Sequence, residues 1–229
     1  VFEICSKFNE YHIDKGATMA YQSLCDEALS NVNRSNLTME HFADIVKKYN
    51  HAKIPTYSEL ILGLPGETKE SFTKGICDLL EYGQHKAIQV YTCDLLPNSD
   101  MGSPEFVEKF GIETVKTPFF QAHCSALEKH EIPEYNSAVI KTNTLSVDDW
   151  IYCVVFACLV QAFHNIGFFR AVAMYLRNEK GISYHEIYSS VAEGFLKNEN
   201  SAGNSVYSAV RNLAKGMTEG QNAWAAACD

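Results

Sequence analysis

The sequence predicts an α/β fold in which a short parallel sheet is followed by a cluster of helices. Three short apolar segments, 17–21, 56–62 and 87–91, alternate with segments of helical periodicity. Strand, helix and strand at these lengths favour right-handed parallel βαβ units. Further along, the segment 150–163 is apolar on all sides, which is typical of the centre of a helical domain or of a membrane span.

Composition restricts the classes of partner and the location. The chain has 229 residues, 46% of them hydrophobic, which is enough for one good core or for a domain and a smaller one. A net charge of -9 and scattered basic residues argue against a nucleic acid as the main partner. The eight cysteines lack the close paired spacings of a disulfide framework, and several lie in apolar runs. We therefore predict reduced cysteines and a cytoplasmic protein.

The first strand brings two polar residues to its carboxyl end. Residues 1–11 carry apolar side chains at helical spacing, and Gly16 ends that helix. The buried strand 17–21 then leads directly into Gln22 and Ser23. These side chains are candidates for ligand binding, or they satisfy backbone groups of the loop.

The most informative stretch is ELILGLPGET at 59–68. An apolar strand runs into a sharp Gly/Pro turn at 63–66, and Thr68 is a plausible N-cap for the next helix. The turn thus lies at the carboxyl end of a strand, where parallel α/β proteins bind ligands. Gly63 allows backbone angles that a side chain forbids, and Pro65 fixes one angle. A purely structural βα turn would use the same residues.

Glu59 is a charged residue in an otherwise apolar strand. Burying a carboxylate without a partner is costly, so the sequence predicts a partner for it, functional or structural.

The segment 102–146 connects the sheet to the helices. Ser103-Pro104 predicts the start of a brief helix, and 137–142 predicts a strand on the open edge of the sheet. His123, Cys124 and His130 have a spacing that fits no closed zinc site, so we predict no metal site from them.

Capping signals delimit the helices that follow. Ser146 with Asp149 opens the apolar helix 150–163, which is short for a bilayer and is therefore predicted to be a buried core helix. Ser183 with Glu186 opens a second helix through Lys197, and a third is predicted at 205–217. Together they predict a small α-helical domain.

Residues 1 to about 195 resemble the later part of the radical S-adenosylmethionine (SAM) enzymes, most closely those with an upstream cobalamin-binding domain. The order and spacing of five segments carry the resemblance: KGATMAYQSL (15–24), NVNRSNLT (31–38), ELILGLPGET (59–68), IQVYTCDLLPNS (88–99) and IPEYNSAVIKTNTLSVDDW (132–150). The family's cluster-binding C-x-x-x-C-x-x-C motif is absent from the sequence. The resemblance therefore implies a C-terminal fragment whose cluster loop lay before Val1.

The resemblance also implies cofactor-binding positions at the carboxyl ends of the strands. Gln22 and Ser23 would lie near the ribose and methionine part of SAM, and Ile61 would offer an apolar side chain to adenine. The backbone after the third strand would touch adenine too, although apolar residues that close the end of a barrel would look the same. The full set is Gln22, Ser23, Glu59, Ile61, Gly63, Pro65, Leu95 and Leu96. No catalytic residue and no metal ligand is assigned.

In fold and chemistry, the resemblance implies an incomplete parallel (β/α) TIM-like barrel at 1–101, a connecting segment with an edge strand at 102–146, and a helical domain at 147–229. A four-iron four-sulfur cluster with upstream ligands would cleave SAM to a 5'-deoxyadenosyl radical, driving methyl transfer or another modification of a small-molecule or biosynthetic-intermediate substrate. Flavodoxin or ferredoxin would supply the electron, and cobalamin, if used, would bind an upstream domain. The alternative is a non-catalytic binding or interaction module that lacks the cluster.

Overall fold

The computed structural model describes residues 1–13, 16–118 and 134–221. Three parallel strands, β1 (Ala17–Gln22), β2 (Thr56–Leu62) and β3 (Ala87–Thr92), form a sheet in that order. Helices α2 (Asp26–Asn31) and α3 (Met39–His51) connect β1 to β2, and α4 (Lys69–Glu81) connects β2 to β3. The predicted α/β class and the parallel βαβ units are confirmed.

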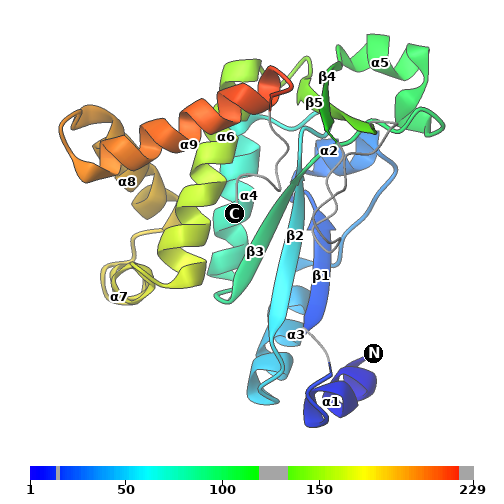
Figure 1. Cartoon of the computed structure of the whole chain (residues 1–229). Coiled ribbons are helices and arrows are strands. Elements are labelled where there is room, and N and C mark those ends of the chain that lie inside the picture. The colour runs from blue at the N-terminus through cyan, green and yellow to red at the C-terminus, as the bar shows by residue number, and fades with distance from the viewer. Residues whose placement is uncertain (14–15, 119–133, 222–229) are drawn as a thin grey trace.

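The two faces of the sheet differ. Along β2 buried and half-buried residues alternate, so that Leu60 and Leu62 are buried whereas Glu59 and Ile61 are not. Leu60 and Leu62 belong to one buried cluster with apolar residues of α3 and α4. The other face of β2 is more open because, in the described part of the chain, no helix covers it (Figure 1).

A second, two-stranded sheet lies beyond the carboxyl ends of the parallel strands (Figure 1). It is antiparallel and pairs β4 (Glu113–Pro118) with β5 (Tyr135–Lys141), after the short helices η1 (Asp100–Gly102) and α5 (Pro104–Phe110). The expected strand near 137–142 is present as β5, which also bonds to residues 93–95 directly after the outer strand β3, and its place on the open edge of a barrel stays a prediction. Its partner strand β4 is polar and mostly exposed, so no apolar pattern in the sequence predicts β4.

The remaining helices are α1 (Phe2–Glu10), α6 (Val147–Val160), the π-helix η2 (Gln161–Ile166), α7 (Arg170–Lys180), α8 (Tyr184–Lys197) and α9 (Ala202–Thr218). The predicted caps are confirmed, since the Ser146 and Ser183 hydroxyls accept the expected backbone N–H groups. Helix α7 was not predicted. Helix α9 begins at Ala202 under the cap of Ser201, three residues before the predicted start at 205.

One hydrophobic core joins the sheet to the helices. Its buried members include Leu60 of β2, Phe72 of α4, Trp150 of α6 and Tyr188 of α8, and α6 lies between α4 and α9 (Figure 1). Among the described residues one segment, Val147–Ile166, is long and apolar enough to cross a membrane by length and composition alone; 56% of its most apolar stretch is buried. This packing supports the interpretation of α6 as a core helix. The division into three domains stays a prediction.

Candidate functional site

The segments that follow the three parallel strands meet at one end of the sheet, the upper end in Figure 1. Ser23 follows β1, the turn Gly63–Gly66 follows β2, and Cys93 follows β3. Two contacts with β5 close this end: the Val139 N–H donates to the Cys93 carbonyl oxygen at 2.8 Å, and Asp94 forms a bridge with Ala138. The carboxyl ends of the strands thus form a compact edge with an ordered backbone.

A buried polar pair links the end of β1 to the end of the turn. The Ser23 hydroxyl donates to Oε1 of Glu67 at 2.7 Å and accepts the Cys25 N–H at 2.9 Å. Both residues are about 1% exposed, and Oε2 of Glu67 has no hydrogen-bond partner among the described residues. Burial raises the pKa of Glu67 to about 8, and the hydrogen bond from Ser23 opposes this rise. The carboxyl group is therefore mainly protonated at neutral pH.

Gln22 has a strained backbone. Its φ is +57°, and the Ser23 N–H donates to the Tyr21 carbonyl oxygen at 2.7 Å, which makes a γ-turn centred on Gln22. The pairing of β1 with β2 shifts register at the same place. Residues held in such conformations cluster at functional sites, where the surrounding structure enforces them. Gln22 is half-buried, and among the described residues its side chain forms no hydrogen bond.

The Gly/Pro turn is buried by the chain itself. A Cβ on Gly63 would lie 3.2 Å from the Val139 carbonyl oxygen, and one on Gly66 would lie 2.6 Å from Nδ2 of Asn31. That Asn31 amide donates to the Pro65 carbonyl oxygen at 3.1 Å. Both glycines have positive φ. Packing therefore accounts for the predicted residues Gly63 and Pro65, and a cofactor role for them stays a prediction.

The open face of the sheet collects polar and aromatic side chains. Glu59 pairs in register with Gln89, and Ile61 with Tyr91. The Tyr91 hydroxyl donates to Oε1 of Gln89 at 2.7 Å, while burial, followed by the charges of Glu59 and Tyr57, raises the pKa of Tyr91. Among the described residues no hydrogen bond or ion pair is formed by the Glu59 carboxylate, so a functional partner for it stays a prediction. Because this face is partly open to water, the carboxylate needs no buried partner.

The two leucines after β3 have different environments. Leu95 is half-buried against a small cluster that includes Val139, and its N–H donates to the Ser137 carbonyl oxygen. Leu96 is 63% exposed. The structure therefore leaves Leu96 available for contact and gives Leu95 a packing role.

Sequence reasoning missed Glu67, Tyr57, Gln89 and Tyr91 as site residues. In the sequence, Glu67 is only one residue of the stretch 59–68. What marks it as a site residue is its hydrogen bond with Ser23, which is far away in the sequence. The other three residues lie on the open face because successive residues of a strand point to opposite faces. Applying this rule to β2 and β3 would have indicated them.

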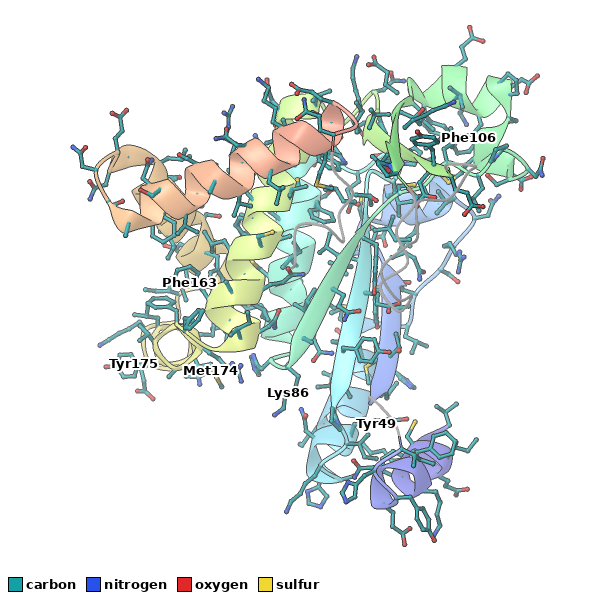
Figure 2. All side chains as sticks on the ribbon, in the orientation of Figure 1. Tyr49, Lys86, Phe106, Phe163, Met174 and Tyr175 are labelled. Carbon is teal, nitrogen blue, oxygen red and sulfur yellow. The ribbon has the colours of Figure 1, made fainter. Side chains whose placement is uncertain are left out.

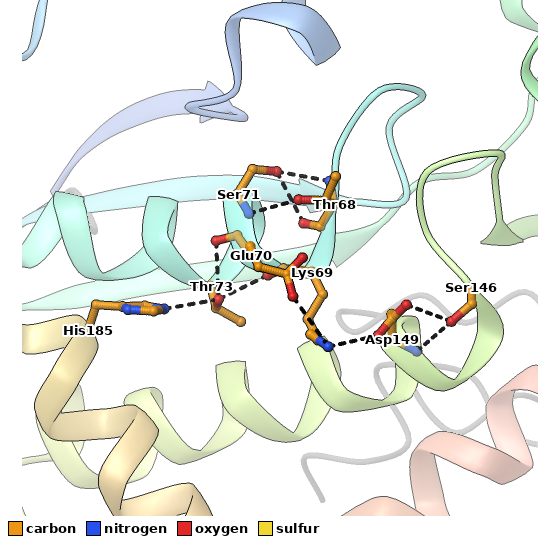
Figure 3. A network of polar contacts seen from close by, with 8 residues as sticks. All are labelled: Thr68, Lys69, Glu70, Ser71, Thr73, Ser146, Asp149 and His185. Carbon is orange, nitrogen blue, oxygen red and sulfur yellow. Dashed lines mark hydrogen bonds and ion pairs between the residues drawn. The ribbon is translucent and has the colours of Figure 1, made fainter.

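Helix α4 begins directly after this site and is held in place by polar contacts (Figure 3). Thr68 and Ser71 form a reciprocal capping box, as the predicted N-cap at Thr68 requires. Lys69 Nζ lies 3.2 Å from Oδ1 of Asp149 in α6, and Thr73 Oγ1 lies 3.3 Å from Nε2 of His185 in α8. The hydrogen bond with Asp149 is the main cause of the raised pKa of Lys69. Contacts with α6 and α8 thus hold the start of α4, which directly follows the turn.

The described cysteines do not fit an iron-sulfur cluster. Among the described residues, no group of three or more His, Cys, Asp or Glu side chains is arranged to hold a metal ion. Cys77, Cys93 and Cys153 are buried, and burial raises the pKa of each thiol, for Cys93 to about 12. Thiolates are the ligands such clusters need, and these three remain thiols at neutral pH. His123, Cys124 and His130 lie outside the described residues.

Comparisons with known proteins complete this view of the site. No protein-family model matches the chain. The chain is 33% identical over 213 residues to the 2-(S-pantetheinyl)-carbapenam-3-carboxylate methyltransferase of Streptantibioticus cattleyicolor, and 31% identical over 217 residues to the cobalamin-dependent radical SAM methyltransferase TokK of Streptomyces tokunonensis. Each match covers 93% of this chain and 31% of the relative.

The fold and the site define an α/β protein with polar side chains gathered at the carboxyl ends of parallel strands. Within that class, the resemblance found in the sequence motifs is confirmed: over 93% of its length the chain is related to a cobalamin-dependent radical SAM methyltransferase and to a second methyltransferase. It spans less than a third of the length of these relatives.

Proposed function

We propose that this chain is part of a cobalamin-dependent radical SAM methyltransferase and that its sheet holds SAM. The observation that carries the proposal is the match of 93% of the chain to two methyltransferases, one of them named as cobalamin-dependent and radical SAM. In this proposal β1, β2 and β3 are strands of a parallel (β/α) barrel, their open face is the barrel interior, and 147–229 forms a helical domain behind it, after the connecting segment 102–146.

The side chains on the open face suit SAM. Adenine needs an apolar surface, and half-buried Ile61 offers one on the same face as Glu59. The ribose hydroxyls and the ammonium group are donors, and the unpaired Glu59 carboxylate is an acceptor. Gln22 offers an amide at the end of the neighbouring strand. Mixed apolar and acceptor groups of this kind are the usual composition of a nucleoside site.

In the reaction, the bound cofactors supply the radical and methyl-transfer chemistry. This chain binds and orients SAM, keeps water from the adenosyl group, and surrounds it with few abstractable hydrogen atoms. The described residues include no fitting cluster ligands and none that we assign to cobalamin, so both groups are placed on other parts of the protein. We further propose a small-molecule substrate, an electron donor such as flavodoxin or ferredoxin, and a cytoplasmic location.

A non-catalytic binding module is the second candidate. It is favoured by one observation, namely that the described cysteines form no cluster site. The two candidates differ in whether the full-length protein, reconstituted anaerobically, forms 5'-deoxyadenosine from SAM.

The test uses that full-length protein with Glu59→Ala and Ile61→Ala. Each substitution removes one contact, worth about 1 to 1.5 kcal/mol, so we expect the KM for SAM to rise about 10-fold. Lys86→Ala is the control. Lys86 is exposed and directly precedes β3, so it lies at the amino-terminal end of the sheet, whereas Phe106 of α5 lies at the other end (Figure 2). An unchanged KM in both site variants removes the proposed SAM site. Absence of 5'-deoxyadenosine from the wild type supports the non-catalytic module.

A further inference from the structure

We propose that Glu67 is a positioning residue: through the Ser23 hydroxyl, its carboxyl group fixes the γ-turn at Gln22 and so sets how Gln22 meets SAM. This inference rests on the proposed function and assigns a role to a residue that the sequence motifs did not single out. It also changes the role of Ser23, from a direct cofactor contact to an intermediate in this connection.

The first step is that every hydrogen-bonding group of Ser23 already has a partner within the chain. Its hydroxyl donates to Glu67 and accepts from the Cys25 N–H. Its carbonyl oxygen accepts from Nδ2 of Asn36 at 2.7 Å, and its N–H donates to Tyr21. Since Ser23 is also about 1% exposed, a bound SAM molecule cannot reach it without breaking this set of bonds.

The second step is that the same bonds hold Gln22 in an unfavourable conformation. A non-glycine residue with positive φ in a γ-turn costs of order 1–3 kcal/mol and persists only where its neighbours enforce it. The peptide between Gln22 and Ser23 is held on the Ser23 side by Glu67, Cys25 and Asn36. Of these three, Glu67 is the residue that belongs to a different strand-turn unit, so it joins the end of β1 to the turn after β2.

The third step is that Glu67 is itself immobile. Its carbonyl oxygen accepts from Oγ1 of Thr144 at 2.8 Å, and its N–H donates to the Leu64 carbonyl oxygen. Because its carboxyl group is mainly protonated, a glutamine at this position would keep the same neutral acceptor for Ser23. Glutamine is therefore the conservative replacement and alanine the disruptive one.

The test measures SAM affinity and KM in the full-length, cofactor-loaded protein, together with amide hydrogen exchange in the present chain. We expect Glu67→Ala and Ser23→Ala to weaken SAM binding and to raise the KM about 10-fold with kcat changed less than about 3-fold, which is the effect of one lost ground-state contact. In both variants, exchange at the Cys25 amide should become about 10-fold faster. Glu67→Gln should restore both properties to within about 3-fold of the wild type.

Ser183→Ala is the control, because it removes the hydroxyl that accepts the Glu186 N–H at the start of α8 and leaves the Ser23–Glu67 contact. It should lower stability without changing the KM for SAM. If the wild type binds SAM and Glu67→Ala binds it equally well while the Cys25 amide is deprotected, Glu67 is only structural and the inference is overturned. Unchanged exchange in Glu67→Ala overturns it as well. A wild type that does not bind SAM refutes the proposed function instead.

Discussion

A side chain at Gly66 is strained, because its φ is +94° and a Cβ would lie 2.6 Å from Nδ2 of Asn31, which would have to move. Gly194, in the middle of α8, has no atom within 4 Å of the same position and an ordinary helical backbone. We expect Gly66→Ala to lower the free energy of unfolding by about 2–4 kcal/mol, through strain and loss of the bond from Asn31 to the Pro65 carbonyl oxygen.

Gly194→Ala is the control, and it should stabilise the chain by about 0.5–1 kcal/mol because alanine loses less backbone entropy in a helix. Urea unfolding of both variants measures the two changes. Equal stabilities for Gly66→Ala and the wild type would show that the turn is not packed against α2 as described.

For Glu59, the sequence predicts the position of the residue but not the environment of its side chain. Its place in the middle of β2 was predicted correctly, since the strand bounds are those expected. An apolar run predicts burial on both faces of the strand, and with it a buried partner for Glu59. The observed alternation instead leaves Glu59 half-buried on the face that no helix covers in the described part of the chain, so its partner stays a prediction.

At the scale of elements, a buried imidazole joins the sheet to the helices. His164 of η2 is fully buried, with Nε2 at 2.9 Å from Nδ1 of His85 and Nδ1 at 2.8 Å from the Tyr188 hydroxyl of α8. Burial, followed by the charges of His85 and Arg170, lowers the pKa of His164 to about 3. The junction thus requires a neutral imidazole.

This requirement predicts acid sensitivity. Between about pH 6.5 and pH 3 the unfolded chain binds a proton at His164 and the folded chain does not, so stability present above pH 6.5 is lost as the pH falls, by at most about 1.4 kcal/mol per pH unit. His85, whose pKa is also lowered mainly by burial, adds to this slope. His164→Gln should flatten the slope in this range.

Urea unfolding at a series of pH values measures this dependence of the free energy of unfolding on pH. Tyr188→Phe is the control, because it removes the hydroxyl but keeps the titrating ring, and its slope should remain. An identical slope in the wild type and in His164→Gln would contradict the prediction.

Elements were predicted well where their signals are local. Thr68 caps α4 as expected, and α8 ends at Lys197 as predicted. Helix α7 was missed because no side chain caps its first turn. Strand β4 was missed because it lacks alternating apolar residues.

At the scale of the whole molecule, we expect this chain by itself neither to hold a four-iron four-sulfur cluster nor to cleave SAM. A cluster of the radical SAM type needs three thiolates that converge, and the buried cysteines of the described residues remain thiols at neutral pH. Anaerobic reconstitution with iron and sulfide, followed by a search for 5'-deoxyadenosine, measures both properties.

The control is a longer protein that contains this chain together with a C-x-x-x-C-x-x-C segment, which should acquire both the cluster and the activity. A stoichiometric cluster on the present chain, with 5'-deoxyadenosine formed from SAM, would show that its cysteines converge after all.

The sequence by itself determined the features that depend on neighbours along the chain: the strand-turn-helix at 59–68, the helix caps, the α/β class and the relation to radical SAM enzymes. Only the tertiary structure decided which face of β2 is open, that β5 pairs with β4, and that Ser23 is bonded to Glu67. The physical reason is distance along the chain. A cap or a Gly/Pro turn is satisfied within a few residues, whereas Ser23 and Glu67 are 44 residues apart and meet only because β1 and β2 lie side by side.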